Sequence, residues 1–209
     1  MDMQDFLPKL KQHLLPRILP TLQSNNVIPD IGRSECDPNA VLFRHDRIYR
    51  HNLLRVNYTT YDVRRSQDVM NASTSHHNII VLADDDNDPT SDHPFKYARI
   101  LGIYHVNALY VGHGMVDYQP RRMDFLWVRW YQNPDVMCNG LGWRDDKLDC
   151  IKFPSVTQDK SFGFVDPAHV LRGCHIIPRF SCGKVYADGK GLSRCAKDSG
   201  DWTQYYVNR

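Results

Sequence analysis

A chain of 209 residues, of which 42% are hydrophobic, is long enough to bury one sizeable core, so we expect one main domain with an appendage. The net charge of +2 is too small to identify a nucleic-acid-binding protein from totals, and any such role must come from local clusters. The sequence contains no run of about 18 apolar residues, and prolines and charges interrupt its N-terminus, which excludes a membrane span and a typical signal peptide. We therefore expect a soluble, unsecreted protein without a membrane partner.

The first expected element is an amphipathic helix. Its apolar residues recur at helical spacing and are Leu7, Leu10, Leu14 and Ile18. Pro16 is expected to break or kink this helix, with a further turn or two to about Leu22. The polar segment that follows is expected to be a loop. We therefore predict a helical arm and loop over residues 1–39 and a β domain over residues 40–209.

Short runs of strand-forming residues fill the β domain. The earlier runs are 41–43, 47–49, 53–61 and 78–82. The later runs are 93–112, 125–131, 148–153, 174–177 and 202–207. In the long run 93–112, Gly102 interrupts one apolar face, which indicates a bulge or bend in a strand that coils around a small barrel.

One short helix is predicted near residues 167–172. Asp166 suits the N-cap, Pro167 suits the first helical position, and Gly173 suits a left-handed C-terminal position. Many short strands, one small helix and no βαβ alternation predict a mainly β fold, an antiparallel barrel or sandwich.

Five segments of the chain share a pattern with a known family. In order they read RVNYTTYDVRRSQD (55–68), HPFKYARILGIYHVN (93–107), FLWVRWYQ (125–132), FGFVDPAHVLRGCHIIPRF (162–180) and GLSRCAKDSGDWTQYYVNR (191–209). Together they resemble the C-terminal region of Plavaka-type transposases, which are CACTA-like DNA-transposon proteins of mushroom-forming fungi. The strand order also resembles a bromo-adjacent homology (BAH) domain, a distorted SH3-like barrel of chromatin and DNA-associated proteins.

The resemblance implies a nuclear, transposase-derived module that binds DNA or chromatin and is not an enzyme. The family's RNase H-like catalytic domain would lie upstream, and the C-terminal edge is expected to be truncated. The alternative is a protein-interaction barrel that reads a histone tail or docks on a transposase catalytic domain. A metal-dependent nuclease fragment is a third hypothesis, which we do not favour.

Arginine side chains cluster in two places. The first cluster is balanced locally only by Asp46 and Asp62, and its members are Arg44, Arg47, Arg50, Arg55, Arg64 and Arg65. The second is the pair Arg121 and Arg122, expected in the loop between the two aromatic strands. Guanidinium groups suit phosphate oxygens, and nearby aromatic rings can stack on unpaired bases.

The candidate nucleic-acid contacts are Arg55, Arg64, Arg65, Arg121 and Arg122. Composition alone narrowly favours arginines that face water or pair with the acidic run 84–88, whereas the family resemblance favours DNA contact. Four rings form a possible aromatic cage for a methylated ammonium group. They are Tyr104, Trp127, Trp130 and Tyr131, although a small barrel also needs such rings to fill its core.

Catalytic and cofactor motifs are not apparent in the sequence: it has no Gly-x-Ser-x-Gly elbow and no phosphate-binding glycine loop. The run 84–88 is better explained as a solvated loop than as a magnesium site. Six scattered cysteines favour reduced thiols over disulfides. Whether Cys174, Cys182 and Cys195, with His175, bind a metal stays open, because their spacing does not match structural zinc sites. We expect no cofactor and no metal.

Overall fold

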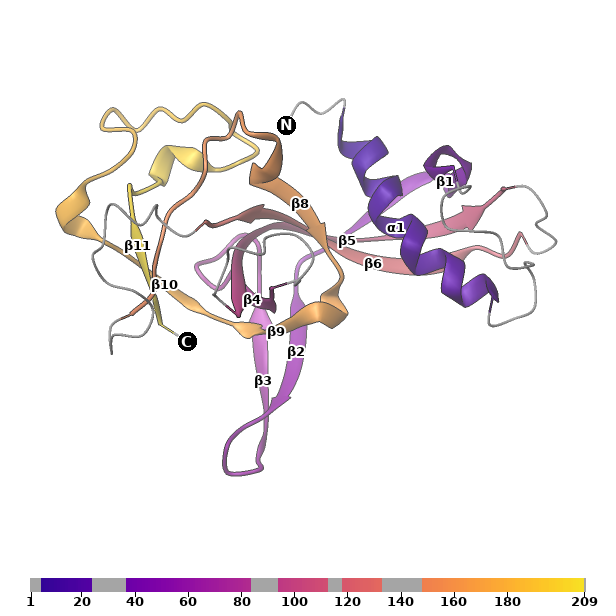
Figure 1. Ribbon diagram of the computed structural model, residues 1–209, viewed down its shortest axis with the longest axis horizontal. Coiled ribbons are helices and arrows are strands. Elements are labelled where there is room, and N and C mark those ends of the chain that lie inside the picture. Colours follow the sequence, from indigo (N-terminus) through magenta and orange to yellow (C-terminus); the bar gives the residue numbers. More distant parts are fainter. Residues whose placement is uncertain (1–4, 24–36, 84–93, 113–117, 133–147, 209) are drawn as a thin grey trace. The chain divides into compact units, whose positions relative to one another are not determined.

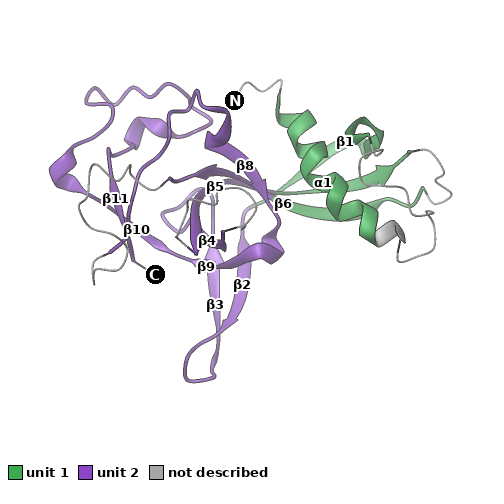
Figure 2. Ribbon diagram, in the orientation of Figure 1, with its two compact units in different colours: residues 1–51, 104–125 green, residues 52–103, 126–209 purple. Residues whose placement is uncertain are grey.

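The structure, a computed structural model, describes residues 5–23, 37–83, 94–112, 118–132 and 148–208. The chain forms two compact units (Figure 2). Unit 1 contains residues 1–51 and 104–125, and unit 2 contains residues 52–103 and 126–209. Two long strands, β5 (Phe95–Tyr110) and β6 (Arg121–Trp130), contribute residues to both units. This partition differs from a division into an arm, 1–39, and a β domain, 40–209.

The described residues of unit 1 form one helix and parts of three strands. The helix α1 (Phe6–Gln23) is continuous through Pro16 and Pro20, so the chain does not leave the helix at Pro16. Of the four residues predicted to form its apolar stripe, Leu7 is half exposed, and the other three, Leu10, Leu14 and Ile18, are buried. Among the described residues, no helix has both the length and the apolar character needed to cross a membrane.

The strands of unit 1 begin after a short 3-10 turn, η3 (Pro38–Ala40), that leads into β1 (Val41–His51). β1 pairs with β5, and β5 pairs with β6. α1 lies across these strands (Figure 1), and the Arg17 guanidinium donates a hydrogen bond of 2.9 Å to the backbone oxygen of Asp124 in β6.

Unit 2 contains the remaining strands, in three separate sets. The main sheet has the order β8-β6-β5-β4-β9, with β4 (Asn78–Leu82), β8 (Phe162–Val165) and β9 (Val170–Gly173). A second sheet has the order β10-β11-β7, with β7 (Cys150–Ile151), β10 (His175–Pro178) and β11 (Tyr205–Asn208). A separate hairpin consists of β2 (Leu54–Thr59) and β3 (Arg65–Met70). The described part of unit 2 also contains the 3-10 turns η5 (Asp159–Ser161), η6 (Pro167–His169), η7 (Phe180–Cys182) and η8 (Asp198–Gly200).

The predicted mainly β class, with antiparallel strands and an N-terminal helix, is confirmed. The described strands do not close into a barrel, because the path of the main sheet ends at β8 on one side and at β9 on the other.

The segment near 167–172, predicted to form one or two helical turns, forms the single 3-10 turn η6. The Asp166 side chain accepts a hydrogen bond from the backbone N–H of Ala168, and Pro167 follows it, so the predicted start is correct. The chain then enters strand β9, whose pairing with β4 places Gly173 opposite Ile79. The expected left-handed role of Gly173 is therefore wrong. Pairing with a buried strand outweighs the weak helical preference of so short a segment.

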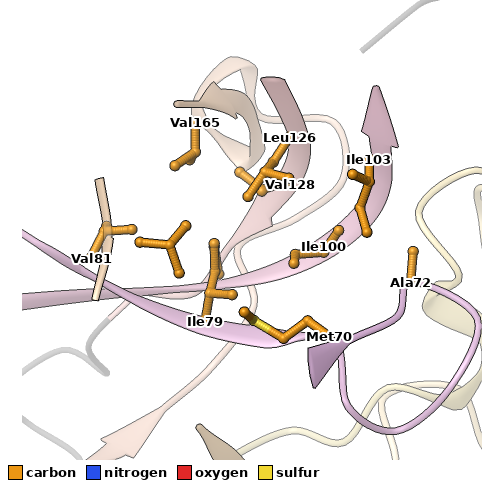
Figure 3. Packing of buried hydrophobic residues seen from close by; sticks show 11 residues of the cluster. Met70, Ala72, Ile79, Val81, Ile100, Ile103, Leu126, Val128 and Val165 are labelled. Atoms are coloured by element: carbon orange, nitrogen blue, oxygen red, sulfur yellow. The ribbon is translucent and has the colours of Figure 1, made fainter. Parts of the chain in front are cut away.

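Strand β4 lies between two hydrophobic clusters of unit 2. Ile79 and Val81 belong to the first cluster, which includes Met70, Ile100 and residues of β6 and β8 (Figure 3). Ile80 points to the other side and joins a second cluster. The members of that cluster are Ile80, Tyr97, Tyr131, Ile151, Tyr205 and Val207. Since alternate residues of a strand face opposite sides, this short strand anchors two cores at once.

A charged group of three side chains is buried beside the second cluster. Asp201 accepts hydrogen bonds from the Arg99 guanidinium at 2.9 Å and from the Arg129 guanidinium at 2.5 Å. Its side chain is 2% exposed, and that of Arg129 is 4% exposed. Both guanidinium groups also lie over the Phe153 ring, at 4.4 Å and 4.0 Å from its centre. One carboxylate therefore offsets the burial of two cations that come from β5 and β6.

Replacing Asp201 tests how far this group stabilises unit 2. We expect Asp201→Asn to lower the free energy of unfolding by about 3 to 5 kcal/mol, because it leaves two buried guanidinium groups without a counter-charge. Urea unfolding followed by circular dichroism measures the change. Asp188→Asn is the control, since Asp188 is exposed and that change should cost about 0.5 kcal/mol or less. Equal unfolding midpoints for the two variants would contradict the stabilising role.

His77 gives unit 2 a defined response to acid. Burial, followed by the positive charge of Arg99, lowers the pKa of His77 from 6.5 to about 4, with Lys197 and His76 adding in the same direction. The folded state therefore holds His77 neutral at pH values where the unfolded chain protonates it. The contribution of His77 to the free energy of unfolding is fully present above pH 6.5, and it is lost as the pH falls toward 4.

We therefore expect the free energy of unfolding to fall by about 2 kcal/mol between pH 7 and pH 4 on account of His77, after allowance for partial exposure of its ring. Urea unfolding at a series of pH values measures it, and His77→Gln should remove that share of the slope. His76→Gln is the neighbouring control, because that ring is exposed. If both variants keep the slope of the unchanged protein, another group causes the acid sensitivity.

Candidate nucleic-acid interface

The β2–β3 hairpin presents one polar, exposed face. In its antiparallel register, Arg55 pairs with Val69, Asn57 with Gln67, and Thr59 with Arg65. These six residues are the exposed positions of the two strands, whereas the alternate residues between them are partly or fully buried. The Gln67 side-chain amide donates a hydrogen bond of 2.8 Å to the Asn57 side-chain oxygen across the strands. The strict alternation of the strand thus places two cations and three uncharged polar groups on one surface.

The two arginines of this face are Arg55 and Arg65. Within the part of the chain that the structure describes, neither has an ion-pair partner. Arg64, in contrast, lies in the turn and forms an ion pair of 3.0 Å with Asp62. Both members of that pair are well exposed, so it is worth little and opens readily to another anion. Of the three arginines predicted here, two are available and one is partly neutralised.

The opposite face of the hairpin is anchored to unit 2. Met70 belongs to the first hydrophobic cluster, and Leu54 and Val56 pack against it. The Asp68 carboxylate accepts a hydrogen bond of 2.9 Å from the backbone N–H of Gly173 in β9. The guanidinium of Arg172 lies 4.8 Å above the Tyr58 ring. The base of the hairpin is therefore fixed, while the far end extends away from the other strands of unit 2 (Figure 1).

The turn of the hairpin contains a strained residue. Val63 has φ of +63°, and its N–H donates to the oxygen of Thr60 at 2.9 Å. The Thr60 N–H in turn donates to the oxygen of Arg64 at 2.8 Å, and the Thr60 hydroxyl hydrogen-bonds to Asp62. This is a three-residue connection in which glycine normally occupies the left-handed position. A β-branched residue is unfavourable in that conformation. The hydrogen bonds of the turn hold Val63 in it. The neighbouring Tyr61 side chain is completely exposed.

An open hollow of about 440 Å³ lies on the hairpin. Its lining residues are Asn57, Tyr58, Thr59, Arg65, Ser66 and Gln67. Donors and acceptors of both strands meet there, with one guanidinium beside them. The hollow can therefore receive a polar, anionic surface. Sequence reasoning missed Asn57 and Gln67, although the alternating polar residues on either side of the turn residues 60–64 are a hairpin signal.

The remaining predicted arginines lie in unit 1. Arg121 and Arg122 are the first residues of β6, and not part of the preceding loop as expected. The Arg122 guanidinium is exposed and binds the Asp124 carboxylate, with its Nε 3.2 Å from both oxygens and a terminal nitrogen 2.8 Å from Oδ1. Arg121 is partly buried. The structure therefore gives this pair weaker support as a phosphate contact than Arg55 and Arg65.

The four rings of the predicted cage serve packing. Tyr104 stacks on Phe125 in unit 1, at 5.5 Å between ring centres. In unit 2, the ring pairs are Trp127 with Phe162, at 6.1 Å, and Tyr131 with Phe153, at 3.9 Å.

Trp127 and Trp130 point to opposite faces of β6, and Trp130 packs against the first hydrophobic cluster. Gly163 makes room for Trp130, since a Cβ there would lie 2.5 Å from the indole nitrogen. The rings that lie in unit 2 therefore do not surround a common hollow.

The possible zinc ligands near the C-terminus are not gathered into a site among the described residues. Cys174, Cys182 and Cys195 are free thiols. Burial raises the pKa of Cys174 to about 12, which disfavours the thiolate form. Cys182 is close to the side-chain oxygen of Gln204, at 3.6 Å. The acidic run 84–88 lies outside the described residues.

Comparisons with models of known protein families, with curated proteins and with solved structures return no match. The resemblance to Plavaka-type transposases and to BAH domains therefore stays a prediction from the sequence segments. The candidate interface rests on the geometry of the hairpin.

The strain at Val63 can be measured by hydrogen exchange. We expect Val63→Gly to increase the protection of the Thr60 amide about fivefold, because a left-handed residue with a Cβ costs about 1 kcal/mol more than glycine. Val69→Gly is the matched control in an extended strand position, where added backbone freedom should reduce protection. Reduced protection in both variants would show that Val63 is unstrained.

Proposed function

We propose that the protein is a non-catalytic DNA-binding module whose contact element is the outer face of the β2–β3 hairpin. The observation that carries the proposal is the pairing of Arg55, Arg65, Asn57 and Gln67 on one exposed surface. Phosphate contact needs cations that are not already neutralised, and these two arginines meet that condition within the described residues.

The shape of the hairpin fits the groove of a duplex. The major groove of B-DNA admits a two-stranded β-ribbon, and the β2–β3 hairpin is such a ribbon with a fixed base. Asparagine and glutamine side chains can bind the major-groove edge of adenine, and arginine can bind that of guanine or a phosphate. Asn57 and Gln67 hydrogen-bond to each other in the free protein, so they would exchange this bond for contacts to bases.

The sequence resemblance agrees with this function. The segment 55–68, which contains the whole turn of the hairpin, is one of the five that resemble the C-terminal region of Plavaka-type transposases. We infer from these segments that the chain derives from such a transposase, that its antiparallel strands correspond to a BAH-like, SH3-like arrangement, and that it acts in the nucleus on DNA or chromatin. In this role the hairpin would help a transposase engage its DNA.

Fluorescence anisotropy with a labelled random-sequence duplex, at several salt concentrations, tests the proposal. The double variant Arg55→Gln, Arg65→Gln should bind more weakly at every salt concentration. The slope of log K against log salt should become shallower by about 1.8, because each lost phosphate contact contributes about 0.9.

The control removes the same charge elsewhere. Arg47 and Arg50 are exposed residues of β1, so Arg47→Gln, Arg50→Gln changes the net charge equally. That variant should retain the slope and most of the affinity. An equal loss in both double variants would attribute binding to net charge alone. No binding by the unchanged protein at low salt would reject DNA and favour the alternative of a protein-interaction module, to be tested with histone peptides and transposase catalytic domains.

A further inference from the structure

Three neighbouring strands of unit 1 bring two histidines and one aspartate together. His51 ends β1, His105 lies in β5 and Asp124 lies in β6. The candidate ligand atoms of the three side chains all lie within 4.8 Å of one another, and each residue is partly buried. The nitrogens His51 Nε2 and His105 Nδ1 are 2.6 Å apart.

The cluster occupies the sheet face opposite the one that contains Tyr104 and Phe125. Those two rings stack on each other, so they share a face. His105 and Asp124 are their immediate neighbours in β5 and β6, and side chains alternate along a strand. The cluster is held in place by Tyr49, whose ring stacks on that of His105 at 4.7 Å with an angle of 10° between the planes.

The short contact between the two imidazoles indicates that the cluster can bind a cation that accepts nitrogen lone pairs. Two neutral rings at 2.6 Å must share one proton, with one nitrogen donating and the other accepting. When the donating ring carries its proton on its other nitrogen instead, both facing nitrogens offer a lone pair, and a metal ion can accept both. In a tetrahedral zinc site two ligand nitrogens lie about 3.3 Å apart, so the rings need to separate by about 0.7 Å, which small side-chain rotations supply.

Asp124 supplies the third ligand and Arg122 supports it. The carboxylate already accepts from Arg122, but its two oxygens have about four lone-pair sites, so one remains for a metal ion. Ligating carboxylates in metal sites are commonly hydrogen-bonded in this way. The arginine charge also opposes a cation nearby, which weakens binding without blocking it.

We propose that His51 Nε2, His105 Nδ1 and Asp124 form a binding site for a first-row divalent transition-metal ion of the zinc class. Two imidazoles and one carboxylate suit such an ion better than calcium or magnesium, which prefer oxygen ligands. Three protein ligands leave a fourth coordination position to a solvent molecule. The site lies wholly in unit 1 and is independent of the proposed DNA contact in unit 2.

The test is a titration of the purified full chain with Zn²⁺ under reducing conditions, in competition with a chromophoric chelator. We expect one equivalent to bind, and His51→Gln and Asp124→Asn each to weaken binding at least about tenfold. Arg122→Gln should tighten binding about threefold, because it removes a nearby positive charge. Substitution with Co²⁺ should give a visible absorption spectrum of tetrahedral type, which the His51→Gln variant loses.

A control in the same strand separates this site from general histidine binding. His45 is an exposed residue of β1 outside the cluster, so His45→Gln should bind Zn²⁺ as the unchanged protein does. Circular dichroism confirms that each variant is folded. Failure of the unchanged protein to take up Zn²⁺ would overturn the proposal, as would uptake that survives both His51→Gln and Asp124→Asn, since the ion would then lie elsewhere, for example on the cysteines.

Discussion

The burial of two guanidinium groups beside a single carboxylate is the constraint on which unit 2 depends. Arg99 and Arg129 extend from neighbouring strands into a region already crowded by aromatic rings, where an unpaired charge costs several kcal/mol. Asp201 relieves this cost only when the C-terminal segment has returned to β5 and β6. The same segment then contributes β11, with Tyr205 and Val207, to the second hydrophobic cluster. Charge pairing and apolar packing therefore require the same chain path, which favours one arrangement of strands over others.

The β2–β3 hairpin has a fixed base, which holds its exposed residues in place. Asp68 and Met70 attach β3 to the body of unit 2, so the exposed residues further along the ribbon keep a constant register and orientation. A rigid presentation of Arg55 and Arg65 reduces the entropy lost on binding, because less freedom remains to be removed. Strain in the turn has the same source as the rigidity, since the hydrogen bonds that fix Thr60 and Arg64 also hold Val63 in its left-handed conformation. Such local strain is common where a loop carries function.

The sequence predicted the class of the fold and most of the longer strands, because β-branched and aromatic runs such as 78–82 and 95–110 have few alternatives. Prediction from the sequence was wrong where the pairing between strands determines the secondary structure. Residues 170–173 look helical alone but pair with β4, and residues 65–70 look polar and irregular until β2 lies beside them. For the sites, single residue types could be named, such as Arg55 and Arg65. The meeting of His51, His105 and Asp124 depends on strand order, which residue spacing along the chain does not contain.

The sharing of β5 and β6 between the two units has a consequence for the order of events during synthesis. Unit 1 takes its strands from residues 41–51 and from 104–125. It therefore cannot be complete when residues 41–51 leave the ribosome. At typical rates of translation the intervening residues, 52–103, take about 3 to 10 seconds to appear. During that interval the apolar stripe of α1, including Leu10 and Leu14, has no sheet to cover it. This stripe therefore stays uncovered until residues 104–125 have been synthesised, and unit 1 is completed only as unit 2 is being made.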